Sequence, residues 1–341
     1  MSKKKKSQKL RENMPPVLGV VEDEPDVRDF QYEEVMGAVK PDWKTGYDNE
    51  LEYGPLREDR QGYSLGCVSF GSTNDMEMSV KKILNKDVNF SQRFIYSQIY
   101  LSGGGASARD AYKLLNQQGV CEDEYMHTAV GPNLTEAQMR DRTGLEEAKK
   151  NAAQWKIGAY RSIPPTNVEA LAQAIYENGG CGGGYRSIGV NMGHFVFFPG
   201  YGYWKGYPGF KYHDSYAPHD KWIVFNNNKF YLDNPTGHQV ELFSMWTAEP
   251  DKSWAKYNEE TQNMSLIRKR GTKEVFLKLG NERIWVKSEE DFNLLKDNQP
   301  ISGISWDNII DVDVFDSEYN GRIVGKFDLA DWLKNVLGKI N

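Results

Sequence analysis

Hydrophobic residues recur at mostly helical spacing after Cys67, and this pattern predicts an amphipathic helix over about residues 67–85. Helices of this kind bury one apolar face and expose the opposite one. Three further helices are predicted: residues 107–118 before Gly119, residues 136–154, and a helix capped by Thr166 or Asn167 that runs to Tyr176 before Asn178-Gly179-Gly180.

Beyond about residue 180 the apolar pattern changes to short aromatic and β-branched runs, which are typical of strands. These runs are HFVFFPGYGYW, KWIVFNNNKFYLD and HQVELFSMW, and each is broken or bounded by Gly, Pro or Asn. A helical half therefore precedes a β-rich half. The order predicts an α+β fold with a helical lobe (about 61–160), a β-rich lobe (about 165–250) and a cleft between them.

The two ends of the chain differ in texture from this central part. Residues 1–25 are polar and basic and are expected to form a disordered tail, whereas residues 26–250 hold the main domain. Residues 251–263 are typical of a linker. Residues 264–341 are predicted to form a small α+β module that begins with a hairpin whose turn is Gly280-Asn281. A short helix near 288–295, a strand in WDNIIDVDVF and a last helix over 329–337 are predicted to complete it.

Charge and hydropathy exclude several classes of protein. The formal net charge is −6, but residues 1–13 carry six Lys or Arg against one Glu, so the remainder stands near −11. An acidic body argues against nucleic acid as a partner, because phosphate binding depends on clustered Lys and Arg. No apolar segment follows the basic start, and no run is long enough to cross a bilayer. We therefore expect no signal peptide, no membrane partner, and a cytoplasmic location, or a virion-associated one if a phage encodes the chain.

Three cysteines, Cys67, Cys121 and Cys181, are too few for a disulfide framework and too unevenly spaced for a zinc motif. Asp311 and Asp313 lack the rest of a calcium loop. We therefore predict no metal and no cofactor. The odd number of cysteines leaves at least one thiol unpaired within the chain, which raises the question of a reactive one.

Cys67 is the best candidate for that reactive thiol. It follows the polar loop QGYSLG and stands where a helix begins, and the positive end of a helix favours the thiolate form. A nucleophilic thiolate needs a histidine beside it and a third group to orient that histidine. His194, after a glycine at the entry of an apolar strand, and Asp214, twenty residues later, are suitable candidates. A packed core cysteine and a packed histidine at a strand end are the alternative interpretations.

These residues lie in segments that resemble the papain-like cysteine peptidases. DRQGYSLGCVSFG resembles the family's QGxCGSCWAF block, and Gln61 precedes Cys67 by six residues as it does there. The upstream EPDVRDF is similar to the DWR opening of mature enzymes. The resemblance covers about residues 23–235, and four more blocks follow in the family's order: GGGASARDAYKLLNQQGVCEDEYM, AYRSIPPTNVEALAQAIYENG, MGHFVFFPGYG and KYHDSYAP.

The resemblance implies a role for each matching residue. Cys67 would be the nucleophile, His194 the general base and then acid, and Asp214 the group that orients His194. The Gln61 side chain and the Cys67 N–H would form the oxyanion hole. Substrate-binding residues would be Tyr216 and the pair Gly104 and Gly105, whose bare backbone would let an extended peptide pair with it.

The sequence departs from the family's pattern at several positions. Val68 replaces the Trp after the nucleophile, Ser64 replaces a disulfide-forming Cys, and Asp214 and Tyr216 replace the usual Asn and Trp. Only some 25 residues precede the DVRDF block, so we expect no long inhibitory pro-segment and expect activity to be controlled in some other way.

Three functions are compared. The first is a cysteine endopeptidase that cleaves peptides or proteins through a Cys-His-Asp triad and an acyl-enzyme. The second is a catalytically weak or inactive module in a larger assembly, possibly a phage particle. The pattern RKRGTKEVFLKLGNERIWV, which resembles modules of bacterial surface and phage-associated proteins, favours an assembly partner for the C-terminal module. A small cell-wall amidopeptidase fits badly, because its Cys and His lie much closer than 127 residues.

Overall fold

The computed structural model describes residues 19–24, 26, 29, 41–190 and 192–251, together with four strands between residues 264 and 312. The chain divides into two compact units, Met1–Asp251 and Lys252–Asn341. Within the described part, none of the helices has the length and apolar character needed to cross a membrane.

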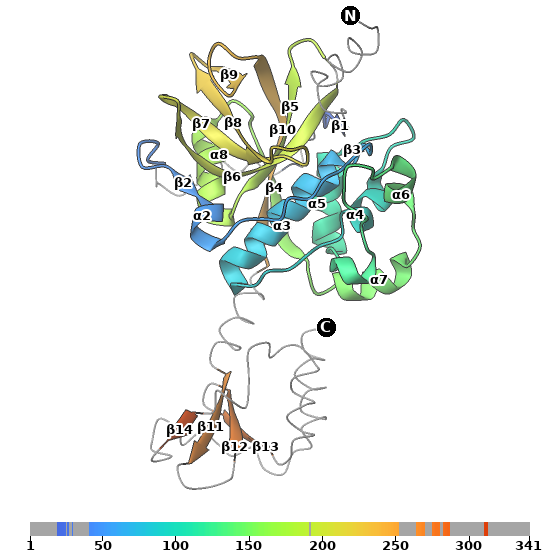
Figure 1. Cartoon of the computed structure of the whole chain (residues 1–341), viewed down its shortest axis with the longest axis vertical. Coiled ribbons are helices and arrows are strands. Elements are labelled where there is room, and N and C mark those ends of the chain that lie inside the picture. The colour runs from blue at the N-terminus through green and yellow to red at the C-terminus, as the bar shows by residue number, and fades with distance from the viewer. Residues whose placement is uncertain are drawn as a thin grey trace, which may run out of the picture. The chain divides into compact units, whose positions relative to one another are not determined.

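A ten-stranded sheet forms most of one side of the first unit (Figure 1). Its main path runs β3-β1-β6-β5-β10-β9-β8-β7, while β2 pairs with β6 and β4 pairs with β10. The sheet is mostly antiparallel, and its central strands supply much of the aromatic core. The strands are β1 (Val20–Val21), β2 (Tyr47–Asp48), β3 (Ala106–Ser107), β4 (Ile157–Ile163), β5 (Cys181–Ser187), β6 (Met192–Trp204), β7 (Tyr207–His213), β8 (Asp220–Asn226), β9 (Lys229–Leu232) and β10 (Gln239–Pro250).

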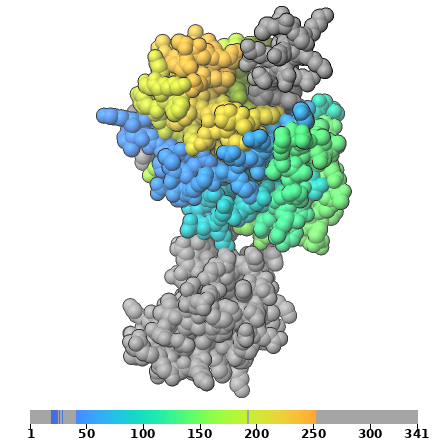
Figure 2. Space-filling view, in the orientation of Figure 1, coloured from blue at the N-terminus to red at the C-terminus, as the bar shows by residue number. Residues whose placement is uncertain are grey.

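Most of the helices gather on the other side of the unit, and Figure 2 shows the same division on its surface, where the β-rich part is yellow to orange and the helical part cyan to green. This arrangement confirms the α+β class predicted from the order of the patterns. The helical elements are α2 (Asn49–Tyr53), α3 (Cys67–Leu84), α4 (Gln92–Ile99), α5 (Ala108–Gln117), the 3-10 turn η2 (Asp123–Tyr125), α6 (Glu136–Arg140), α7 (Leu145–Ala152) and α8 (Val168–Asn178).

Helix α3 is the element that joins the two halves, because it packs against β6 and is buried along nearly its whole length. Its close approach to the sheet depends on Gly71. A β-carbon at Gly71 would lie only 2.6 Å from Cδ1 of Phe195, so a larger residue would push the helix away from the strand. The helix thus brings its first turn close to the strand that carries His194.

The structure confirms the helix predicted to start at Thr166 or Asn167, which is α8. The Asn167 side chain accepts a hydrogen bond from the Ala170 N–H at 3.1 Å, and Gly179 ends the helix with a φ of +95°.

The single helix predicted over residues 136–154 is wrong, because α6 and α7 are separate helices. Gly144 has a φ of +87° immediately before α7, and the Asp141 side chain accepts hydrogen bonds from the backbone and hydroxyl of Thr143. These contacts form a local turn that competes with the helix.

Residues 19–24 differ from the disordered tail that was expected over residues 1–25. Strand β1 pairs in parallel with β3 and antiparallel with β6. Asp23 fixes the end of this segment, since its carboxylate accepts hydrogen bonds from the Ser107 hydroxyl at 2.6 Å and the Trp246 indole at 2.9 Å. Residues 1–18 and residue 25 lie outside the described residues.

The second unit contains a four-stranded sheet in the order β13-β12-β11-β14. Strands β12 and β13 pair antiparallel as the predicted hairpin requires, and β14 falls in the predicted strand segment WDNIIDVDVF. The turn residues 280–281, the predicted linker from residue 252 to 263 and the predicted helices near 288–295 and 329–337 lie outside the described residues. The strands are β11 (Met264–Lys269), β12 (Val275–Leu279), β13 (Glu282–Val286) and β14 (Ile310–Val312).

Candidate active site at the start of helix α3

Cys67 is the first residue of α3, as the sequence predicts, and its side chain is fully buried. The loop before it is held from the helical side, because the Leu65 N–H donates a hydrogen bond of 2.8 Å to Oε2 of Glu136. The N–H groups of a first helical turn have no partner within the helix, so they favour negative charge on a side chain that lies there.

His194 lies on β6 and is also fully buried. Its Nε2 atom is 2.8 Å from Oδ1 of Asp214. The other ring nitrogen, Nδ1, has no hydrogen bond of ordinary geometry among the described residues, yet Cys67 is close enough to affect the titration of the ring. The structure therefore brings together Cys67, His194 and Asp214, which the sequence places far apart.

His194 and Asp214 each stabilise the charged form of the other. Burial alone would lower the pKa of His194, but the Asp214 carboxylate and then Cys67 outweigh burial and raise the pKa to about 9. Burial alone would raise the pKa of Asp214, but His194 first and Lys221 second lower it to about 2. At neutral pH His194 is therefore an imidazolium and Asp214 a carboxylate.

Lys221 is a member of this group that the sequence did not reveal. Its Nζ atom lies 2.6 Å from Oδ2 of Asp214 and 3.1 Å from the carbonyl oxygen of Tyr216. The other carboxylate oxygen, Oδ1, accepts the Tyr216 N–H at 2.9 Å as well as the contact with His194. Lys221 comes from β8, and only the pairing of β8 with β7 brings it beside Asp214. No local motif signals this position.

Two tyrosines surround the His194 ring. The Tyr216 ring centroid lies 5.4 Å from that of His194, and the Tyr185 ring meets it edge-on at 5.7 Å. Tyr216 thus lies beside the His194 ring, and its contact with substrate stays a prediction. Tyr185 was not predicted, and it stands directly opposite His194 in the pairing of β5 with β6.

Gln61 is buried between the loop before Cys67 and the loop after Asp214. Its side-chain amide donates to the carbonyl oxygen of Ser64 at 2.8 Å, and its Oε1 accepts from the Ser215 hydroxyl. An amide nitrogen carries two N–H groups, so one further donor is available for a bound group. A contact of Gln61 with substrate stays a prediction.

Gly104 and Gly105 both have left-handed backbones, with φ of +88° and +75°. A β-carbon at Gly105 would lie 2.3 Å from the carbonyl oxygen of Gly19, so the backbone just before β1 packs directly against Gly105. The Gly105 N–H donates to the Tyr96 hydroxyl at 3.1 Å, and that hydroxyl donates to Glu136 at 2.6 Å. Since Glu136 also holds the loop before Cys67, one carboxylate positions both segments.

Strand β1 lies between β3 on the helical side and β6 on the sheet side. The Gly19 N–H donates to the carbonyl oxygen of Gly193 at 3.0 Å, and the Gly19 carbonyl oxygen accepts from the Ala106 N–H at 2.8 Å. A β-carbon at Gly19 would be 3.0 Å from Sγ of Cys67. The expectation that activity is controlled by something other than a long pro-segment stays a prediction.

No protein-family model matches the sequence, and no curated protein matches it either. The structure is similar to that of xylellain, a cysteine protease from Xylella fastidiosa, with 18% identity and a TM-score of 0.52 over 68% of this chain and 96% of xylellain. The ragweed pollen allergen Amb a 11, a cysteine protease in its proform, is a weaker match, with 15% identity and a TM-score of 0.47 over 68% of this chain and 65% of that one. This chain has the papain-like fold that the sequence blocks predicted.

Proposed function

We propose that this chain is a cysteine endopeptidase in which Cys67 is the nucleophile, His194 the acid and base, and Asp214 the group that orients His194. The observation that supports this most directly is the placement of His194. One ring nitrogen contacts Asp214 at 2.8 Å, while Cys67 at the start of α3 raises the pKa of the same ring. A histidine held between a carboxylate and a thiol is the arrangement that thiol nucleophiles require.

In the proposed reaction the Cys67 thiolate attacks the carbonyl carbon of a peptide bond. The His194 imidazolium gives its proton to the leaving amine, and the neutral ring then accepts a proton from the water that hydrolyses the acyl-enzyme. The Cys67 N–H and the remaining Gln61 amide donor would stabilise the oxyanion, each at roughly 3 kcal/mol. Lys221 would hold Asp214 in place, and Tyr216 would exclude water from the contact between Asp214 and His194.

The proposed substrate is an extended peptide that pairs with the backbone around Gly104 and Gly105 and with that of Gly193. Main-chain pairing of this kind gives affinity with little dependence on side chains. Val20 of β1 now pairs with Ala106, the residue after Gly105, and with Gly193. A substrate must therefore displace β1 before it can reach Cys67, because the backbone hydrogen bonds that join β1 to β3 and β6 occupy its path.

An epoxysuccinyl peptide tests the proposal, because it alkylates a thiol only when a peptidase cleft orients it. We expect mass spectrometry to find the label on Cys67 alone. Cys121 and Cys181 provide internal controls, since burial raises the pKa of Cys121 to about 12 and that of Cys181 well above its usual value. Cys67→Ala should abolish cleavage of a peptide library without loss of folded structure. Labelling of Cys121 or Cys181 before Cys67 would contradict the assignment.

The alternative function, a papain-like module that serves in a larger assembly, is favoured by one specific observation. Gly19, which immediately precedes β1, lies against Cys67, and the cysteine side chain is fully buried. On this hypothesis the second unit would bind an assembly partner, such as a phage particle, and no hydrolysis would be found even when β1 is displaced. The epoxysuccinyl experiment separates the two functions when it is repeated on a variant with β1 released.

A further inference from the structure

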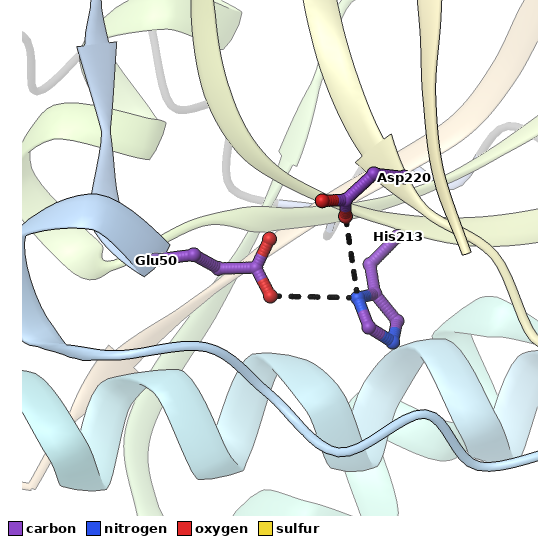
Figure 3. Close-up of side chains that lie close together, drawn as sticks. All are labelled: Glu50, His213 and Asp220. Atoms are coloured by element: carbon purple, nitrogen blue, oxygen red, sulfur yellow. Dashed lines mark ion pairs between the residues drawn. The ribbon is translucent and has the colours of Figure 1, made fainter. Parts of the chain in front are cut away.

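A second cluster of potential ligands lies away from Cys67, where α2 meets the ends of β7 and β8 (Figure 3). It consists of Glu50 from α2, His213 from the end of β7 and Asp220 from the start of β8. Nδ1 of His213 is 3.4 Å from Oε1 of Glu50 and 3.8 Å from Oδ1 of Asp220. One atom from each residue falls within 4.8 Å of the other two.

The His213 ring is oriented by its other nitrogen. Nε2 lies 3.1 Å from the carbonyl oxygen of Arg57, and a carbonyl can only accept, so Nε2 carries the hydrogen. In the neutral ring this leaves a lone pair on Nδ1, directed toward the two carboxylates. His213 is only 3% exposed, and Nδ1 has no hydrogen-bond partner among the described residues. A histidine fixed in this way by a backbone carbonyl is the usual form of a metal ligand.

The surrounding charges leave room for a dication. Lys211 Nζ lies 2.8 Å from Oε2 of Glu50, 3.0 Å from Oδ2 of Asp48 and 3.4 Å from Oδ2 of Asp220. Three carboxylates and one ammonium carry a net charge of −2 when the ring of His213 is neutral. Lys211 also uses the other oxygen of both Glu50 and Asp220, so the oxygens that face His213 stay available.

The facing oxygen of Glu50 is itself held in position, because Oε1 accepts the Leu56 N–H at 3.0 Å. Metal–nitrogen and metal–oxygen bonds of about 2.0–2.2 Å in a tetrahedral site place neighbouring ligand atoms roughly 3.3–3.5 Å apart. The separation between His213 and Glu50 fits this spacing. Oδ1 of Asp220 lies 3.8 Å from Nδ1 of His213 and must move closer to both other ligand atoms, and its 60% exposed side chain has room to do so.

We propose that Glu50, His213 and Asp220 bind one divalent transition-metal ion of the zinc class, with water as the fourth ligand. An imidazole in the ligand set favours such ions over calcium and magnesium, which prefer oxygen alone. The sequence did not reveal the site because the ligands come from three elements with no motif spacing. The ion would connect α2 to the two strands that flank Asp214, and so stabilise the loop between Asp214 and Asp220.

The test uses full-length protein with Cys67→Ala, because a thiol beside His194 can itself bind a soft metal. The protein is treated with chelator and then titrated with Co²⁺, followed by Zn²⁺. We expect one equivalent of Co²⁺ with the visible spectrum of a tetrahedral site, its displacement by Zn²⁺, and a higher melting temperature with Zn²⁺, since an ion that binds only the folded state stabilises it.

Asp220→Asn is the decisive variant, because Asp220 is exposed and its substitution should not unfold the protein. We expect Zn²⁺ affinity to fall at least about tenfold. Asp233→Asn is the matched control, since Asp233 is an exposed aspartate that pairs with Lys205, and it should leave affinity unchanged. The proposal is wrong if Co²⁺ and Zn²⁺ do not saturate a single site, or if Asp220→Asn binds them as tightly as the parent.

Discussion

Gly19 lies directly against Cys67: a β-carbon added to Gly19 would stand 3.0 Å from Sγ of Cys67 and 2.3 Å from the carbonyl oxygen of Leu65. A side chain does not fit at position 19, where the N-terminal segment crosses the start of α3. The same residue exchanges backbone hydrogen bonds with Gly193 and Ala106, so it spans the gap between β6 and β3. The N-terminal segment therefore covers the candidate nucleophile.

Gly19→Ala should uncover Cys67. The added methyl group would collide with the Leu65 carbonyl, which belongs to a fixed backbone, so β1 must move and not the loop. We expect the rate of Cys67 alkylation by iodoacetamide to rise several-fold, and cleavage of peptides to rise with it if the proposed function is correct.

Gly103→Ala is the matched control for this experiment. Gly103 has a conformation open to other residues, and a β-carbon there would meet no atom within 4 Å. In Gly103→Ala the rate of Cys67 alkylation should equal that in the unaltered protein. Equal rates in all three proteins would show that β1 leaves the cleft too readily to protect Cys67.

Asp214→Asn should move the alkaline limit of activity to lower pH. The Asp214 charge is the main cause that raises the pKa of His194, and the active form needs an imidazolium, so activity is lost as pH rises through about 9. Asparagine keeps the acceptor but removes the charge, and we expect a shift of roughly one to two pH units downward. The measurement is kcat/KM against pH. Asp214→Ala should cost more, because the ring then loses its acceptor too. An unchanged alkaline limit would remove Asp214 from its proposed role.

Lys221→Met should have the opposite effect on the same profile. The Lys221 ammonium lies 2.6 Å from Asp214, so Lys221 and His194 both interact with the negative charge of that carboxylate. Without Lys221, the carboxylate stabilises the His194 imidazolium alone. We expect the alkaline limit to move upward. We also expect kcat/KM to fall roughly tenfold, because the buried Oδ2 atom loses a charged donor. Lys205→Met, at an exposed pair with Asp233, is the control and should change neither quantity. A fall in kcat/KM with an unmoved profile would mean that Lys221 acts only on stability.

Truncation after residue 255 should leave a folded first unit, because the chain divides at Asp251. We expect a cooperative thermal transition and the same rate of Cys67 labelling as in the full chain. Truncation after residue 243 is the contrasting variant. It removes residues 244–250, the part of β10 that pairs with β4 and, at Trp246, with β5, and should abolish cooperative unfolding. If truncation after residue 255 also unfolds the protein, the second unit contributes to the stability of the first.

Local sequence determined several features of this protein directly. The period of apolar residues from Cys67 onward indicated α3, and Asn167 and Gly179 marked the ends of α8, because capping and helical spacing depend on neighbouring residues alone. The short aromatic runs indicated the strands. The order of the blocks around Gln61, Cys67, His194 and Asp214 indicated the papain-like fold, which the structure confirms.

Tertiary structure decided the features that depend on which distant segments pair. Lys221 reaches Asp214 only through the register of β8 on β7, and Gly19 reaches Cys67 only because β1 inserts between β3 and β6. The cluster of Glu50, His213 and Asp220 likewise requires α2 to pack beside two strands. A periodic pattern records which face of an element is apolar, but strand register and long-range packing arise from the summed burial and hydrogen bonding of the whole unit. For this reason the sequence indicated the chemistry of Cys67, while the groups that hold and cover it emerged only from the fold.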